Sequence, residues 1–280
     1  MAAISSLSSL INLATGGSAG APEADFWFKN GRVSGTNVSP VAGRWFTLWN
    51  CDGYPSGGAT PGAAAVPTVA TLGALQFTNP AAGKEKWLIH SGAASNAVGT
   101  VILYDRLLHN GGLSGTVTTA QTVQGTTPSP AITRYTSGTG NVLLIEIYTL
   151  IGATATTLTV YYTDDTNTAR TSTITFGGTS NREANRAQIV PLAAGANGVK
   201  ACEKVQLTAT TGTVGNFGVT IARPICYMPI GVAGAMGWRD FTTGLPTIPK
   251  IETDACLSFY FFSNGTTSPE LFGMLGMVEA

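Results

Sequence analysis

Residues 157–176 read TLTVYYTDDTNTARTSTITF, a run in which apolar and polar residues alternate with a period of two. Leu158, Val160 and Tyr162 share one face of the first half, and threonines occupy the other face. A polar loop at residues 164–169 separates this half from a second one with the same alternation. Because successive side chains of a strand point to opposite sides, the pattern predicts a β-hairpin with one face in the core and one threonine-rich face.

Similar short runs recur along the chain, separated by loops that contain glycine and proline. They lie at residues 44–49, 86–90, 101–104, 142–148, 205–209, 217–221 and 257–261. The run at 142–148 is apolar on both faces apart from Glu146, as expected for a strand buried on both sides. So many short strands at this spacing predict an all-β fold, with a β-sandwich or jelly-roll-like body.

The N-terminal segment has a different pattern. Four aliphatic residues, separated by serines, fall on one face at helical spacing: Ile4, Leu7, Leu10 and Ile11. They predict a short helical arm, which residues rich in Gly, Ser and Ala join to the body. So short a helix is marginal in water by itself, and we expect it to dock on its own body or on a neighbouring subunit. Residues 1–21 would form the arm and its flexible joint, and residues 22–280 the body, as one unit or two packed β subdomains.

The chain is unusually poor in charge. It has 280 residues, of which 44% are hydrophobic and only 11% charged, with 15 basic and 15 acidic side chains; ordinary domains have roughly a quarter charged. An exterior with so little charge indicates a surface covered by neighbouring subunits. The absence of Lys and Arg clusters argues against nucleic acid as a partner. No apolar run reaches the roughly 18 residues of a membrane helix, and no basic residue precedes the weak N-terminal apolar stretch, so we expect no signal peptide.

The cysteines and histidines do not form a metal-binding pattern. The chain contains no CxxC pair, and the histidines His90 and His109 are not at ligand spacing from any of the four cysteines: Cys51, Cys202, Cys226 and Cys256. We expect buried thiols that pack as small hydrophobes; disulfides would require an oxidising compartment. No metal or cofactor site is predicted.

Motifs that resemble catalytic sites lack their context. GGSAG at residues 16–20 matches GxSxG, but no strand precedes it and no helix follows it. Asp105 and His109 lack a third partner of a triad; a salt bridge from Asp105 to Arg106 or another neighbour, with His109 in a turn, is the simpler interpretation. We predict no catalytic residues and no enzymatic activity.

Two other residue groups have structural and functional interpretations. Asp164 and Asp165 are adjacent in the predicted hairpin, where a solvated turn is more plausible than a pair of catalytic carboxylates or a calcium site. The tryptophans could form a sugar-stacking platform, but strand tryptophans are more often anchors of a core or an interface. They are Trp27, Trp45, Trp49, Trp87 and Trp238.

Several stretches of this sequence resemble a family of virion structural proteins of tailed bacteriophages. They are GRWFTLW at 43–49, LYDRLLHNGGLSG at 103–115, RDFTTGLP at 239–246 and LPTIPKIETDACLSFYFF at 245–262. The resemblance covers most of the chain but rests on structural motifs, and it supplies no catalytic residues. The sequence departs from the family at Leu108, where relatives often have tryptophan before the histidine.

The resemblance implies a head decoration or cement protein. Such a protein would bind the major capsid protein and copies of itself as a homo-oligomer, and would be assembled into the virion in the cytoplasm of the host bacterium. A tail or receptor-binding protein is the first alternative, and the major capsid protein itself is the second. A polysaccharide depolymerase ranks last, because the few carboxylates are scattered.

Overall fold

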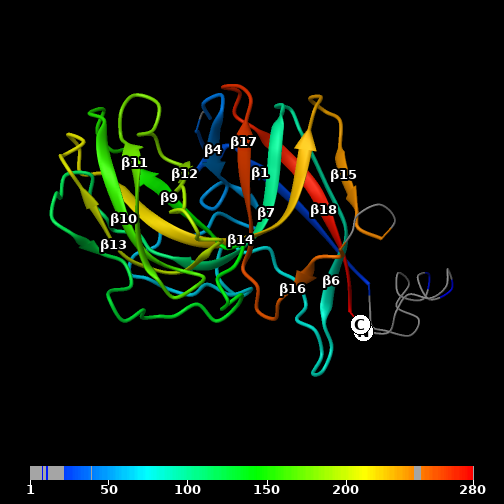
Figure 1. The fold of residues 1–280 in the computed structure, drawn as a ribbon. Coiled ribbons are helices and arrows are strands. Elements are labelled where there is room, and N and C mark those ends of the chain that lie inside the picture. The colour runs from blue at the N-terminus through cyan, green and yellow to red at the C-terminus, as the bar shows by residue number, and fades with distance from the viewer. Residues whose placement is uncertain (1–7, 9–10, 12–21, 39, 243–246, 280) are drawn as a thin grey trace.

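The computed structural model describes residues 8, 11, 22–38, 40–242 and 247–279, and all the elements with defined bounds in this part of the chain are β-strands. The predicted all-β class is confirmed. The strands form a central closed barrel with a sheet packed on each side of it (Figure 1).

The barrel contains six strands, and each one pairs with its neighbours in antiparallel register. In order around the barrel they are β12 (Arg186–Ile189), β4 (Arg44–Thr47), β17 (Leu257–Ser263), β7 (Gly99–His109), β14 (Asn216–Ile230) and β9 (Val142–Thr149). The run predicted to be buried on both sides is β9, which lies between β12 and β14. This position confirms the interpretation of its two apolar faces.

A four-stranded sheet covers one side of the barrel, at the left of Figure 1. Its order is β11 (Ala169–Phe176), β10 (Thr156–Asp164), β13 (Val199–Leu207) and β8 (Gln121–Thr122). The predicted hairpin is β10 and β11, and its apolar residues Leu158, Val160 and Tyr162 are all buried in the core between this sheet and the barrel. The threonine-rich face points away from that core.

A six-stranded sheet covers the other side, at the right of Figure 1. Its order is β15 (Gly237–Asp240), β6 (Lys86–Ser95), β18 (Glu270–Glu279), β1 (Glu23–Asn30) and β5 (Gly53–Tyr54), and β16 (Lys250–Ile251) also pairs with β6. A separate small hairpin consists of β2 (Arg32–Val33) and β3 (Thr36–Asn37). The second large core lies between the six-stranded sheet and the barrel, and it includes Trp27, Phe259 and Met277.

The closed barrel replaces the sandwich expected from the strand pattern. β7 and β14 are long strands that contribute to both large cores: Leu103 and Met228 pack toward the six-stranded sheet, whereas Leu107 and Val219 pack toward the four-stranded one. Two register shifts in the β7–β14 pairing, one of them between Ile221 and Ala222, accompany this course. Because bulges increase strand bending and twist, they allow such long strands to curve into a barrel.

Candidate functional site

Strand β1 places its charged residues and Trp27 on the inward face and its two phenylalanines toward solvent. Lys29 is only 1% exposed, whereas Phe26 is 66% and Phe28 51% exposed. Trp27, between the two phenylalanines, is buried and stacks on Phe259 with ring centroids 4.1 Å apart. Lysine is almost never fully buried unless it is paired, so this orientation is the reverse of the usual one.

The two buried lysines of this region have polar partners. The Lys29 ammonium donates hydrogen bonds to the carbonyl oxygens of Cys51 at 3.0 Å and Ser56 at 3.2 Å, and burial lowers the pKa of Lys29 to about 8. Lys86, also buried, forms an ion pair with Glu23. A slip of one residue would break these contacts and turn every side chain of β1 to the other face, so they hold the phenylalanines outward.

The outward face of the six-stranded sheet carries two apolar rows, defined by direct cross-strand pairing. The first row crosses β5, β1, β18 and β6: Tyr54, Phe28, Phe272 and Ala94. The second row crosses β1, β18, β6 and β15: Phe26, Met274, Gly92 and Trp238. Aromatic cross-strand neighbours of this kind stabilise a sheet. We call the two rows together the apolar rows; Gly92 and Ala94 are buried, so the other residues form the exposed part.

Two glycines shape this surface. A Cβ atom at Gly92 would lie 2.9 Å from the ring of Trp238 and 3.1 Å from the sulfur of Met236, so the glycine allows both side chains to lie close against the sheet. A Cβ atom at Gly273 would lie 2.6 Å from the ring of Trp27. These close approaches leave a shallow groove between the aromatic side chains.

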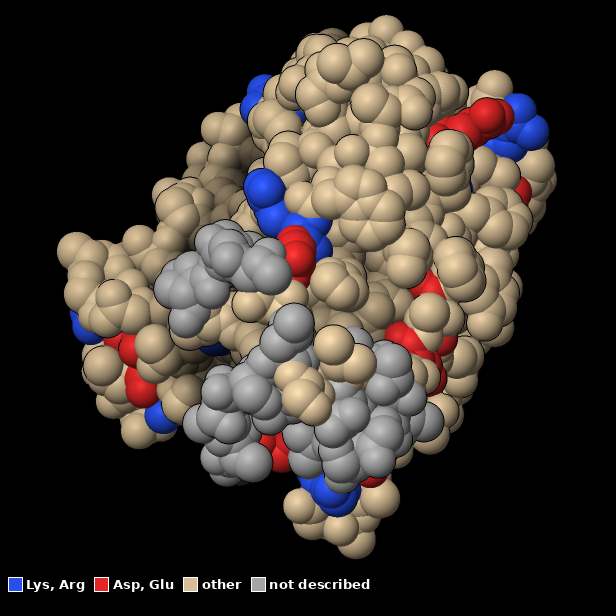
Figure 2. All heavy atoms as spheres, turned by 90° about the vertical axis from the view of Figure 1, so that its right-hand side faces the viewer, with Lys and Arg blue, Asp and Glu red and all other residues tan. Residues whose placement is uncertain are grey.

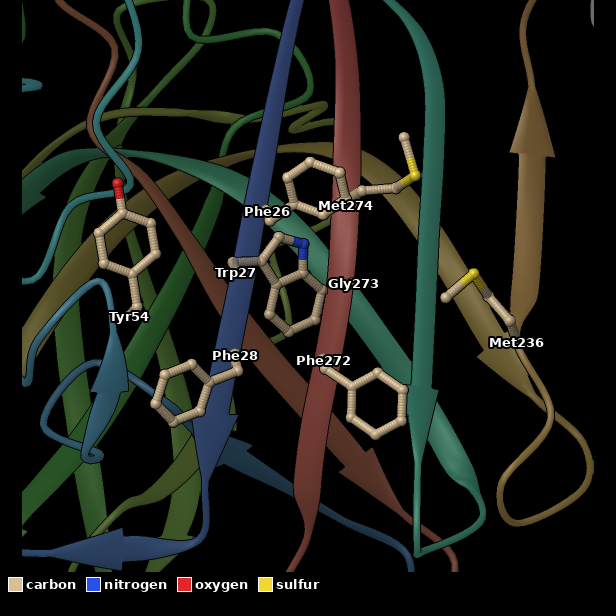
Figure 3. Close-up of a pocket in the computed structure, with 8 residues that line it drawn as sticks. All are labelled: Phe26, Trp27, Phe28, Tyr54, Met236, Phe272, Gly273 and Met274. Carbon is tan, nitrogen blue, oxygen red and sulfur yellow. The ribbon is translucent and has the colours of Figure 1, made fainter.

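The groove has a volume of about 520 Å³ and an almost entirely apolar lining. Phe26 and Met274 lie at one end of it, Phe28 and Phe272 at the other, and Tyr54 and Met236 bound its sides (Figure 3). This lining contains no carboxylate, imidazole, thiol or amine, so the groove is suited to holding apolar groups rather than to acid–base chemistry.

The exposed area of the apolar rows is large for a monomer. Phe26, Phe28, Tyr54, Phe272 and Trp238 are each at least half exposed, and an aromatic side chain has about 150–250 Å² of surface. The exposed aromatic area is therefore on the order of 500 Å², near the upper end of what single soluble proteins show. Figure 2 shows the molecule from the side of β6, β15 and β18, where most of the described surface is uncharged.

Polar residues border the rows. Beyond the second row, the Nδ1 atom of His90 lies 3.5 Å from a carboxylate oxygen of Asp240. Beyond the first row, Asn30 pairs with Glu270. An apolar centre with a polar rim is the usual composition of a protein–protein interface.

The predicted arm lies almost wholly outside the described residues. Ile4, Leu7 and Leu10 are among the residues that the structure does not describe, as is the GxSxG match at 16–20. Ile11 is described and is 50% exposed. The helical arm and its role as an interface therefore remain predictions.

The tryptophans do not form one platform. Trp27 and Trp49 are buried, Trp45 and Trp87 are partly buried, and Trp238 is 53% exposed in the second apolar row. This distribution agrees with anchors of a core and, for Trp238, of a surface.

The four cysteines are buried free thiols, as predicted. Among the residues that the structure describes, no cluster of three or more His, Cys, Asp or Glu side chains could hold a metal ion.

The barrel interior contains a buried polar network that the sequence analysis did not find. Arg106 and Glu146 form an ion pair in which both side chains are 0% exposed. Tyr148 and Thr220 donate hydrogen bonds to the carboxylate at 2.7 and 2.9 Å, and Tyr260 donates a third. Burial alone would raise the pKa of Glu146, but the charge of Arg106 and these hydrogen bonds lower it to about 2. The network is enclosed and fully paired, which is typical of a structural role.

Residues 105 and 109 therefore have other partners than a catalytic triad would give them. The Asp105 carboxylate accepts two hydrogen bonds from Arg134, at 2.8 and 2.9 Å, and not from Arg106. The expectation that His109 lies in a turn is wrong: it is the last residue of β7, and its Nδ1 atom accepts a hydrogen bond from Arg106 at 3.1 Å. Burial, and then the charge of Arg106, lowers the pKa of His109 to about 3.

We expect the neutral state of His109 to make the protein sensitive to mild acid. Between the ordinary pKa of 6.5 and the folded pKa of about 3, the unfolded chain binds a proton that the native state does not bind. Stability contributed by this histidine is therefore lost as the pH falls, by about 2 kcal/mol between pH 7 and pH 5. Urea unfolding of the natural protein and of His109→Gln at pH 7 and pH 5 measures this loss of stability.

The glutamine variant keeps an acceptor for Arg106 but does not titrate, which makes it the appropriate control. Asp25 acts in the opposite sense, because burial, and then the charge of Glu23, raises its pKa to about 6. The difference between the two proteins removes that contribution, since both retain Asp25. Equal pH dependence of the two proteins would show that His109 is protonated in the native state.

The solvated turn predicted for Asp164 and Asp165 is only partly correct: Asp165 lies in the turn, but Asp164 is the last residue of β10 and is buried. Its side chain is 0% exposed and accepts hydrogen bonds from the backbone amides of Thr166 at 2.8 Å and Thr168 at 2.9 Å, and from Arg170 at 2.9 Å. Burial alone would raise the pKa of Asp164, but these hydrogen bonds hold it below its ordinary value. The carboxylate organises the hairpin between β10 and β11, a role typical of aspartate in turns.

Apart from Trp238, the residues that form the apolar rows were not identified from sequence. The alternation in EADFWFKN at residues 23–30 separates Phe26 and Phe28 from the charged residues. This pattern was a usable signal, but it invites assigning the charged face to solvent. The partners of Lys29 and Lys86, and the stacking of Trp27 on Phe259, show that the charged face is inside.

Comparisons with known proteins do not establish a family. No family model and no curated protein matches the sequence. Solved structures with some similarity include infectious bursal disease virus of the Gt strain, at 8% identity and a TM-score of 0.20 over 96% of this chain and 86% of that chain. The T=1 particles derived from this virus have 8% identity and a TM-score of 0.20, over 96% of this chain and 83% of that chain. Its VP2 subviral particle has 9% identity and a TM-score of 0.19, over 96% of this chain and 86% of that chain. Such low TM-scores do not establish a common fold. In the described part of the chain, no helix is both long and apolar enough to cross a membrane.

Proposed function

We propose that this protein is a non-enzymatic structural subunit of a virus particle, and that it functions by packing its apolar rows against neighbouring protein subunits. The observation that carries the proposal is the orientation of β1. Its Lys29 is buried and hydrogen-bonded, and its Glu23 pairs with the buried Lys86, while Phe26 and Phe28 are directed to solvent. A strand oriented in this way is favourable when a partner covers its aromatic face.

The energetics agree with this use of the surface. Covering on the order of 500 Å² of apolar area contributes roughly 12 kcal/mol before the costs of association. The area is smaller than the roughly 800 Å² per partner of a standard interface. The rows would therefore be the apolar centre of a larger contact whose rim includes His90, Asp240, Asn30 and Glu270.

Within virus particles, the sequence resemblance favours a head decoration or cement protein of a tailed bacteriophage. In that role the body would bind the major capsid protein and other copies of itself, and the helical arm with Ile4, Leu7, Leu10 and Ile11 would hold a neighbour. Assembly would take place in the cytoplasm of the host bacterium. Neither nucleic acid nor a membrane is a proposed partner, since the chain lacks clusters of basic residues.

A tail or receptor-binding protein is the second candidate. The observation that favours it is the exposed ring of Trp238 next to the groove, because exposed aromatic rings can also stack on sugars. The major capsid protein ranks below both, since the sequence contains no long periodic helix.

The copy number in purified particles separates these functions. A decoration protein is expected at a ratio to the major shell protein of the same order as one, and a tail protein at only a handful of copies per particle. Quantitative mass spectrometry of purified particles, with isotope-labelled peptides of both proteins as standards, measures this ratio. Absence of the protein from the particles would refute the proposal, and a handful of copies would move the protein to the tail.

A further inference from the structure

We propose that the apolar rows of one subunit bind residues 4–11 of a second copy of this chain. The inference rests on the proposed function, because it names the occupant of the same surface. The N-terminal segment of each subunit would then link it to a neighbour. Three properties of the chain support the inference: where the segment joins the body, its charge, and its size.

The N-terminal segment joins the body at the apolar rows. Residues 1–21 precede Pro22 and β1, and β1 contributes Phe26 and Phe28 to the rows. The segment is therefore attached beside the rows, from which we infer that it binds the rows of an adjacent copy.

The reach of the connecting residues is sufficient. Residues 12–21 separate the aliphatic group from Pro22, and ten residues span at most about 35 Å when extended. The five strands that carry the rows are about 19 Å wide, at about 4.8 Å between neighbours. The extended connecting residues are therefore longer than the rows are wide.

Charge and size also match. Residues 1–21 contain no Asp, Glu, Lys or Arg, so the segment brings no side-chain charge that would be buried without a partner on the uncharged rows. If residues 4–11 are helical, they form about 12 Å of helix, which fits within the width of the rows. Ile4, Leu7 and Ile11 would then form one apolar stripe along it.

Disulfide trapping between differently tagged copies tests the inference. One copy carries Leu7→Cys and an affinity tag, and the other carries Phe272→Cys and no tag; both are otherwise complete. The four natural cysteines are buried, so the introduced thiols react preferentially under mild oxidation. We expect a mixed disulfide between tagged and untagged chains, detected on a non-reducing gel and assigned by mass spectrometry.

Val214→Cys in place of Phe272→Cys is the matched control, because Val214 is an apolar residue with 59% exposure outside the apolar rows. We expect at least tenfold less mixed disulfide with it. Equal trapping at both positions overturns the inference. A third protein carries Leu7→Cys and Phe272→Cys in one chain: a disulfide formed only within that chain shows that the segment covers its own rows, which also overturns it.

This outcome is independent of the particle experiment. A protein that forms the mixed disulfide but never enters particles would contradict the proposed function and leave the link between copies intact. A protein that enters particles without forming it would retain the proposed function and lose its N-terminal link.

Discussion

Glu146→Gln is expected to lower the free energy of unfolding by about 3–5 kcal/mol, because it leaves the Arg106 guanidinium buried without a counter-charge. Both side chains of the pair are 0% exposed inside the barrel, so water cannot solvate the guanidinium that has lost its counter-charge. The amide also offers one acceptor oxygen where the carboxylate has two, and the hydroxyls of Tyr148, Tyr260 and Thr220 all donate to that carboxylate. Urea denaturation at neutral pH measures the change.

An exposed Glu–Lys pair provides the control. A carboxylate oxygen of Glu85 lies 3.0 Å from the ammonium nitrogen of Lys250, and the Glu85 side chain is 46% exposed. Glu85→Gln removes the same charge by the same substitution, but water screens both partners, so a change below about 1 kcal/mol is expected. If both substitutions lowered the free energy of unfolding by the same amount, the barrel network would not be enclosed as described.

Phe272→Glu is expected to abolish incorporation into particles while leaving the isolated protein folded. Phe272 lies at the centre of the first apolar row, between Phe28 and Ala94, and is 51% exposed. In the free protein the new carboxylate is solvated, so the protein should stay folded, with a melting temperature lowered only by the loss of the cross-strand contacts of Phe272. In an assembled contact the carboxylate would be buried without a partner, which costs several kcal/mol at each copy. Quantitative mass spectrometry of purified particles gives the copy number.

Val214→Glu separates the effect of position from that of an added charge. Val214 is 59% exposed and lies outside the apolar rows, so this variant should be incorporated at the natural copy number. Normal incorporation of Phe272→Glu would exclude the apolar rows as the contact surface. A large fall in its melting temperature would instead show that Phe272 supports the fold, in which case the smaller change Phe28→Ser on the same row provides the test.

Local patterns were sufficient for the class of the fold and for many of the strands. The hairpin at 157–176 and the doubly buried run at 142–148 were recognised because the period of two depends only on neighbouring residues. The burial of all four thiols was also predicted, because the cysteines lack the spacing and the partners of a metal site. Composition showed that the exterior is poor in charge, but not which part of it is apolar.

Long-range contacts decided the rest. Alternation shows that the two faces of β1 differ, but the inward face is set by carbonyl groups that lie more than 20 residues from Lys29. The partner of Glu146 is 40 residues away on another barrel strand, and closure of the barrel depends on strand order, which no local pattern contains. A buried charge is tolerable only where such distant groups converge on it. The aromatic surface exists because those partners hold the charged face of β1 inside.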